Sequence, residues 1–186
     1  MKKIIISLVL ALLALPVLGQ DDAPLTRQEK KMLRKEQKKQ YEKMLEVNTS
    51  KAISSGFFVL KADQVRSRYG VVYHVNSSIN FIAIQGKEAF VQLGSESGIG
   101  ANGVGGITLK GEVTNYSVEQ DKDKGSYFIK IYTSSTAGSL TIMMQVNNTG
   151  EMSTATVTTN WGSRVDFTGT VVPVTGSRVF KGTETM

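Results

Sequence analysis

Residues able to carry out catalysis or bind a metal are few in this chain. His74 is the only histidine, and there is no cysteine. A histidine-based metal site or a Ser-His-Asp triad would therefore have to use that one imidazole. His74 lies in the run Val71 to Val75, where alternating side chains indicate an ordinary strand. We therefore predict a protein that is not an enzyme, with no catalytic residue, no metal site and no cofactor.

The carboxylates do not have a spacing that forces two of them together. A glycoside hydrolase needs only two carboxylates, and distant strands can supply them. A carboxylate-dependent hydrolase therefore stays open as an alternative. The acidic residues in question are Glu88, Glu96, Glu112, Glu119, Glu151 and Asp166.

The segment 94–106 is rich in glycine, and Gly98, Gly100 and Gly103 match the pattern G-x-G-x-x-G. Dinucleotide binding needs a helix after that pattern, whereas a strand-like Ile-Thr-Leu run follows here. Two interpretations remain. The glycines supply positive φ angles or a close backbone approach, or the segment is a lip over a barrel mouth whose N–H groups bind a ligand. We favour the first and keep Asn102 and Gly103 as candidate binding residues.

The first nineteen residues have the layout of a secretory signal. Lys2 and Lys3 precede an apolar run from Ile4 to Leu15, and small residues lead to Gly19. The apolar run is too short to span a bilayer. We predict a signal peptide over residues 1–19, cleaved near Gly19, and a periplasmic, cell-surface or secreted protein.

Residues 20–52 are predicted to form a charged helix and a linker. Thr26 and Glu29 fit a capping box, and no Gly or Pro occurs between Arg27 and Glu46. The nine basic and six acidic residues of segment 21–51 account for half of the net charge of +6. We favour a solvated helix that packs on the domain or acts as a stalk, with peripheral membrane contact as the alternative. Nucleic acid is not expected as a partner of an exported protein.

From residue 53 to residue 175 the pattern is that of an all-β domain. Apolar and polar residues alternate in short segments rich in Val, Ile, Thr, Tyr and Phe. Short connections predict antiparallel neighbours, with the last five strands as a meander. A change of phase near Thr114 and Asn115 predicts a β-bulge. The predicted strands are Phe57–Leu60, Val71–Val75, Ile79–Ile84, Ala89–Leu93, Ile107–Glu119, Tyr127–Thr133, Leu140–Val146, Ala155–Thr159 and Val165–Val172.

We therefore expect a small barrel or sandwich, lipocalin-like in outline, with an N-terminal helix before it and a tail over residues 176–186. The runs 80–82, 89–93 and 100–111, together with Trp161-Gly162 and the segment 169–173, resemble an exported Bacteroidetes family catalogued as domain of unknown function 4251. That resemblance implies a periplasmic or surface β-domain, with no catalytic residue to carry over.

The function that we favour is a non-enzymatic binding module of the cell envelope for a small apolar or amphipathic ligand. Closed β-domains of this size often enclose such a site. A structural or protein-interaction domain with an envelope protein as partner is the first alternative, and the hydrolase is the second. The candidate binding residues are Phe81, Asn102, Gly103, Tyr116 and Trp161.

Overall fold

The computed structural model describes residues 26–95, 100–123, 125–135 and 138–185. The predicted signal peptide lies outside these residues, as does Gly98 of the glycine-rich segment. The described residues from Lys38 onward form one compact unit, and those before Lys38 belong to another. Among the described residues, no helix has the length and apolar character that crossing a membrane requires.

Helix α2 spans Arg27–Ser55 and begins with the predicted capping box. The Glu29 N–H donates to Thr26 Oγ1 at 3.3 Å, and the Thr26 N–H donates to a Glu29 carboxylate oxygen at 2.8 Å. The helix continues past Glu46 through residues that the sequence indicates as a linker. Their weak helix propensity is outweighed because Thr49, Ala52 and Ile53 are buried.

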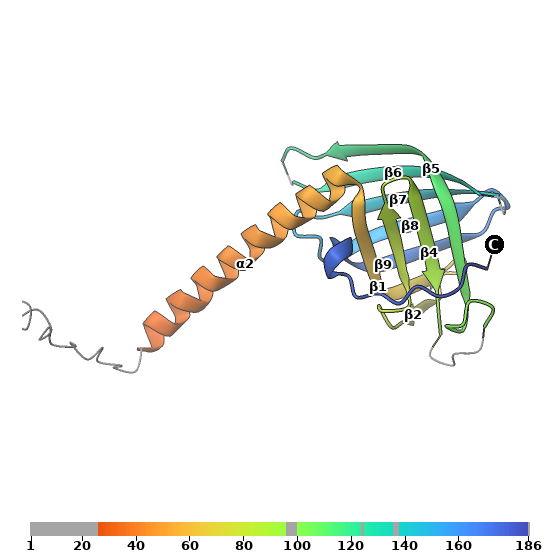
Figure 1. The fold of residues 1–186 in the computed structure, drawn as a ribbon. Helices are drawn as coiled ribbons and strands as arrows, with labels where there is room; N and C mark the ends of the chain where they lie inside the picture. Colours follow the sequence, from red (N-terminus) through yellow and green to blue (C-terminus); the bar gives the residue numbers. More distant parts are fainter. Residues whose placement is uncertain (1–25, 96–99, 124, 136–137, 186) are drawn as a thin grey trace, which may run out of the picture. The chain divides into compact units, whose positions relative to one another are not determined.

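Nine β-strands lie within the described residues, and all of their pairings are antiparallel (Figure 1). Neighbours along the chain pair from β3 to β9, and β9 returns to pair with β1. That last pairing closes eight strands into a barrel, which confirms the all-β prediction and selects a barrel over a sandwich. The strands are β1 Phe57–Ser67, β2 Val72–His74, β3 Phe81–Gln85, β4 Glu88–Leu93, β5 Ile107–Gln120, β6 Tyr127–Ser135, β7 Gly138–Val146, β8 Ser153–Thr159 and β9 Arg164–Pro173.

Two irregularities in pairing shape the barrel. The register of β5 against β6 shifts between Val113 and Asn115, which confirms the predicted bulge. A second shift, which the sequence did not indicate, lies in β1 between Ala62 and Gln64, opposite β9. A Cβ on Gly169 would lie 1.9 Å from the Lys61 carbonyl oxygen, so only glycine allows this close approach.

The end of α2 closes one end of the barrel. The Ile53 side chain is fully buried in the interior cluster together with Ala52 and Phe58. The Tyr116 hydroxyl on β5 donates to the Ile53 carbonyl oxygen at 2.7 Å, and its ring lies 6.5 Å from that of Phe58. The last helical turn therefore acts as an apolar plug.

A second apolar cluster lies on the outer face of β1, β3 and β4. It consists of Val59, Phe81, Ala83 and Phe90, and Val174 and Val179 pack against it. We call the segment from Val174 to Thr185 the C-terminal strap, and Figure 1 shows it running across the outside of the sheet. The strap explains why these strands are apolar on both faces.

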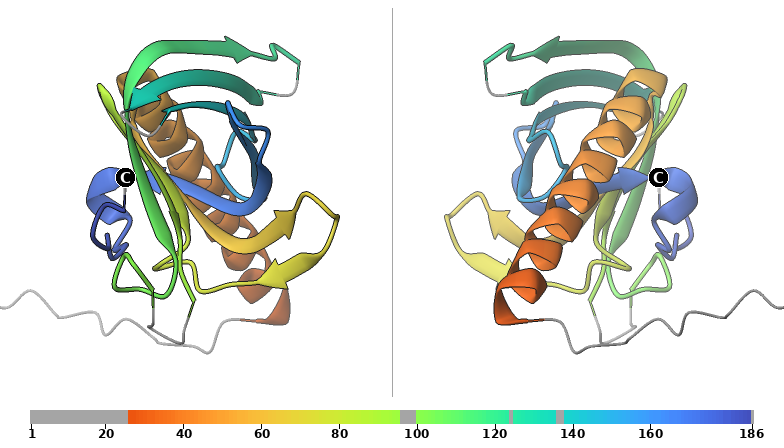
Figure 2. Two further views of the ribbon diagram at one scale, coloured as in Figure 1. Left: turned by 90° about the vertical axis from the view of Figure 1, so that its right-hand side faces the viewer. Right: turned by 90° about the vertical axis from the view of Figure 1, so that its left-hand side faces the viewer.

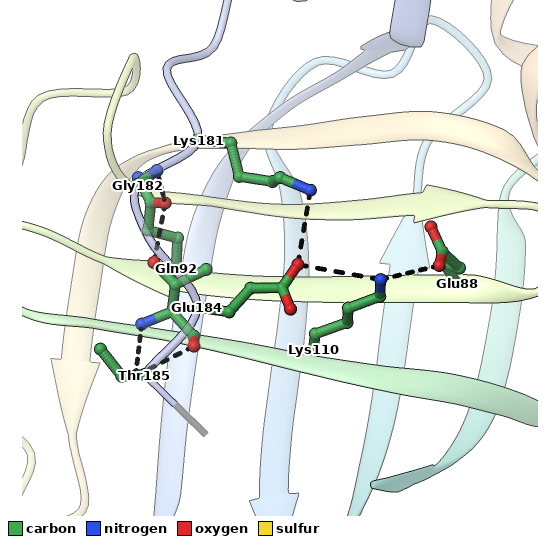
Figure 3. A network of polar contacts seen from close by, with 8 residues as sticks. Glu88, Gln92, Lys110, Lys181, Gly182, Glu184 and Thr185 are labelled. Atoms are coloured by element: carbon green, nitrogen blue, oxygen red, sulfur yellow. Dashed lines mark hydrogen bonds and ion pairs between the residues drawn. The ribbon is translucent and has the colours of Figure 1, made fainter.

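Buried Gln92 fastens the strap to the sheet (Figure 3). Its Nε2 donates to the carbonyl oxygens of Ile79 and Phe180, and its Oε1 accepts bonds from the Gly182 N–H and the Thr108 hydroxyl. These four bonds, of 2.8 to 3.0 Å, use the whole hydrogen-bonding capacity of the amide.

Ion pairs flank the strap at the surface (Figure 3). Lys110 Nζ lies 2.9 Å from the Glu88 carboxylate and 3.8 Å from that of Glu184, which also lies 3.8 Å from Lys181 Nζ. The same Lys181 ammonium lies 3.8 Å from the centre of the Phe90 ring. The strap is therefore an integral part of the fold.

Candidate functional site

An apolar cavity of about 140 Å³ opens at the end of the barrel opposite to the helical plug. Strand β1 leaves the plug at Phe57 and runs to Ser67, which pairs with Val165 at the cavity's end of β9. We call this space the mouth cavity. The side chains that line it come from β4, β5, β8, β9 and the turn between the last two: Val91, Leu93, Ile107, Leu109, Val157, Thr159, Trp161, Ser163, Val165 and Phe167.

Strand alternation explains why the cavity is apolar. Val157 and Phe167 point inward from the ladders of β8 and β9, and both are buried. Among the polar lining groups, the Thr159 hydroxyl is engaged within the turn that joins these strands, because its Oγ1 accepts a bond of 3.0 Å from the Ser163 N–H. A ligand in the cavity would meet hydrocarbon almost everywhere.

Trp161 forms the rim of the mouth cavity and keeps 52% of its side chain exposed. It lies in the β8–β9 turn, where Gly162 has a φ of +84°. A Cβ on Gly138 would lie 2.9 Å from the indole ring, so the missing side chain makes room for the ring against β7. An indole that packs partly on protein and stays half exposed suits contact with an amphipathic molecule.

The five candidate binding residues do not form one site in this structure. Trp161 lines the mouth cavity. Tyr116 lies at the plugged end, and Phe81 is buried under the C-terminal strap on the outer face. Asn102 and Gly103 lie in the glycine-rich segment between β4 and β5.

Asn102 organises that segment. Its Oδ1 accepts bonds from the N–H groups of Val104 and Gly106, and its Nδ2 donates to the Leu93 carbonyl oxygen and the Thr108 hydroxyl. The bonds are 2.9 to 3.3 Å long, and they leave the buried amide no free capacity. Gly103 has a φ of +73°, and a Cβ on Gly106 would lie 2.1 Å from the Leu93 oxygen. The structural interpretation of these glycines accounts for both observations.

Apart from Trp161, sequence reasoning did not select the apolar lining of the mouth cavity. Alternation in four predicted strands places these apolar side chains on one face. They lie at the strand ends that surround the β8–β9 turn. The residues that this alternation would have selected are Val91, Leu93, Ile107, Leu109, Val157, Val165 and Phe167.

Glu88, a charged group outside the cavity, forms an ion pair with Lys110. The hydrogen bond from Lys110 holds the pKa of the Glu88 carboxyl below its ordinary value, against a smaller effect of burial. A general acid at a hydrolytic site needs the opposite shift. No group of three or more His, Cys, Asp or Glu side chains in the described part of the chain is arranged to hold a metal ion. His74 is exposed on β2.

Comparison with known proteins agrees with this fold. A crystal structure of a DUF4251 family protein from Bacteroides eggerthii DSM 20697, at 1.95 Å resolution, has a TM-score of 0.61 and 27% sequence identity to this chain. The match covers 74% of this chain and 93% of that one. None of the curated proteins matches.

The family comparison covers helix and barrel together. The domain of unknown function DUF4251 matches residues 38–171, from within α2 to near the end of β9. This confirms the resemblance seen in the sequence: the chain belongs to the DUF4251 family.

Proposed function

We propose that this domain is a non-enzymatic binding module that takes a small apolar group into the mouth cavity. The observation that carries the proposal is the cavity itself, about 140 Å³ of space lined by aliphatic and aromatic side chains. An engineered apolar cavity of about 150 Å³ in another protein stays dry and binds benzene. A space of this size therefore suits a single ring or the end of a hydrocarbon chain.

The exposed rim favours an amphipathic ligand. Trp161 and Ile107 are both partly exposed where the cavity meets solvent. The apolar end of a ligand would enter between them, and its polar end would stay in water and lose no hydration. Because the sequence begins with a signal-like segment, we place this activity in the cell envelope or outside the cell.

The experiment uses the only tryptophan of the chain as its reporter. We would titrate the protein without residues 1–19 with a bromohexanol that carries bromine on its terminal carbon, because bromine quenches indole fluorescence at short range and the cavity lies directly beside the indole. At roughly 0.6 kcal/mol per non-hydrogen atom, a ligand of this size binds with a Kd of about 0.3 mM. Saturable quenching with a Kd in that range supports the proposal if unbrominated hexanol, by displacing the brominated ligand, reverses it.

Two neighbouring positions on β8 supply a variant and its control. Val157→Phe fills the cavity from inside the barrel, whereas Thr158→Phe adds the same ring to the exposed outer face. We expect Val157→Phe to weaken binding at least ten-fold and Thr158→Phe to leave it unchanged. Linear, unsaturable quenching that is the same in all three proteins would refute the proposal.

A further inference from the structure

Strand β2 has a free edge. It pairs with the second half of β1 and stands at the end of the strand order, outside the closed barrel. Along β1, strand β3 pairs with the first half, from Phe57 to Lys61, and none of the strands in the described residues continues alongside the outer edge of β2. Figure 2 shows the β1–β2 hairpin curling away from the barrel wall.

The register shows which backbone groups face that edge. The Ser67 N–H donates to the Val71 carbonyl oxygen, and the Val75 N–H donates to that of Asp63, both at 2.9 Å. Because hydrogen-bonded and non-hydrogen-bonded pairs alternate in an antiparallel ladder, Tyr73 also turns its backbone groups toward β1. The N–H and C=O groups of Val72 and His74 therefore point outward.

An open groove of about 690 Å³ lies beside this edge. It runs between Tyr73 and His74 on one side and Gly94 on the other, with Ile79 among its lining residues. On the far side the Asn80 side chain takes the place of a strand, because its amide exchanges bonds of 3.0 and 3.1 Å with the Gly94 backbone. The β2 side of the groove has no such substitute among the described residues.

The side chains of this edge do not have the features that usually block pairing. Val72 and Tyr73 are 44% and 55% exposed, and β2 contains neither proline nor lysine. Natural edge strands are commonly protected by such residues, by bulges, by a covering element or by being very short, and of these β2 has only its length of three residues. An exposed β-branched and aromatic edge therefore favours pairing with another strand.

The charge of the hairpin indicates which strand would pair. Its basic residues Lys61, Arg66 and Arg68 outnumber the single acidic residue Asp63. Neither Arg66 nor Arg68 forms an ion pair with another residue in the described part of the chain. The Arg68 guanidinium lies over the Tyr69 ring, 4.7 Å from its centre. An incoming strand with carboxylate side chains would find unpaired guanidinium groups nearby.

We propose that β2 binds an extended acidic segment of a partner protein, which adds to the sheet as a further strand in the groove. The outward backbone groups of Val72 and His74 supply two donors and two acceptors, and Arg66 and Arg68 select carboxylates. This is strand addition at a sheet edge, in which backbone bonds give affinity and side chains give specificity. It does not involve the mouth cavity, so each proposal can fail without the other.

The probe is a fluorescein-labelled octapeptide of alternating valine and glutamate, with a second version that has lysine in place of glutamate. Val72→Pro and His74→Pro each remove one outward N–H and leave the bonds to β1 intact, a position where an edge strand tolerates proline. One backbone hydrogen bond corresponds to roughly a five-fold change in affinity. We expect each variant to weaken binding of the acidic peptide by about that factor.

The control variant Val72→Thr keeps the backbone donor, so it should bind like the parent protein, and Arg66→Glu should lose the preference for the acidic peptide. Fluorescence anisotropy gives affinity, the thermal midpoint shows that each variant is folded, and amide chemical shifts locate the peptide. Shifts centred on residues 71–75 support the proposal. No binding of the acidic peptide, binding by both proline variants that is as tight as that of the parent protein, or self-association through β2 without peptide would overturn it.

Discussion

Replacing Ile53 with alanine tests whether the end of α2 plugs the barrel. Ile53 is 0% exposed and belongs to the same buried cluster as the inward side chains of the strands. The substitution removes three carbon atoms, each worth about 0.8 kcal/mol on transfer to water. The cavity left behind adds to that loss. We therefore expect the free energy of unfolding to fall by about 3–4 kcal/mol.

The matched control is Val47→Ala on the same helix. Val47 is 45% exposed, and substitutions at such positions usually change stability by less than about 0.5 kcal/mol. Urea denaturation of both variants, followed by circular dichroism and by Trp161 emission at the opposite end of the barrel, gives the two free energies. If Ile53→Ala lowers the free energy of unfolding by less than about 1 kcal/mol, or by no more than Val47→Ala does, the end of α2 does not plug the barrel.

Three further predictions follow from other contacts. Gln92→Leu removes four hydrogen bonds from buried groups. We expect the free energy of unfolding to fall by roughly 2–4 kcal/mol and hydrogen exchange in the C-terminal strap to become faster. Unchanged exchange in the strap would show that Gln92 does not fasten it. Burial raises the pKa of Tyr116 to about 12, so the folded state holds this proton more tightly than the unfolded state. The stability that this difference in pKa provides is complete below pH 10 and is lost as the pH rises toward 12. Tyr116→Phe should therefore make the free energy of unfolding fall less at alkaline pH, which denaturation at each pH measures. Gly138→Ala places a methyl group against the Trp161 ring at a φ of +124°, so we expect a shifted emission maximum and weaker bromohexanol binding, whereas an unchanged spectrum would contradict the packing.

Local patterns in the sequence were sufficient to predict most of the local structure. The capping box at Thr26, the bulge between Val113 and Asn115 and the strands of the meander depend on neighbours along the chain or on the next strand. Closure of the barrel depends on β1 meeting β9, a pairing between the two ends of the domain. Alternation fixes the face on which a side chain lies and contains no information about that distant contact.

The same limit explains the candidate binding residues. Trp161 and Tyr116 both lie on elements that contribute to the interior, but Tyr116 is nine residues beyond Ile107 on β5, about 30 Å along an extended strand. The two aromatic residues therefore belong to opposite ends of the barrel. Phe81 and Phe90 lie in runs that are apolar on both faces. Such runs indicate that something covers the outer face, and the sequence alone did not identify the C-terminal strap as that cover.

The most direct test of the central claim is to locate bromine in a crystal of this protein soaked with the terminal bromohexanol. Anomalous scattering identifies a bromine position independently of any assumption about the ligand. The binding-module account predicts one ordered bromine inside the barrel, among Leu109, Val157 and Phe167, with the hydroxyl toward Trp161. A mouth cavity without bromine, at a concentration that saturates the fluorescence change, would contradict it.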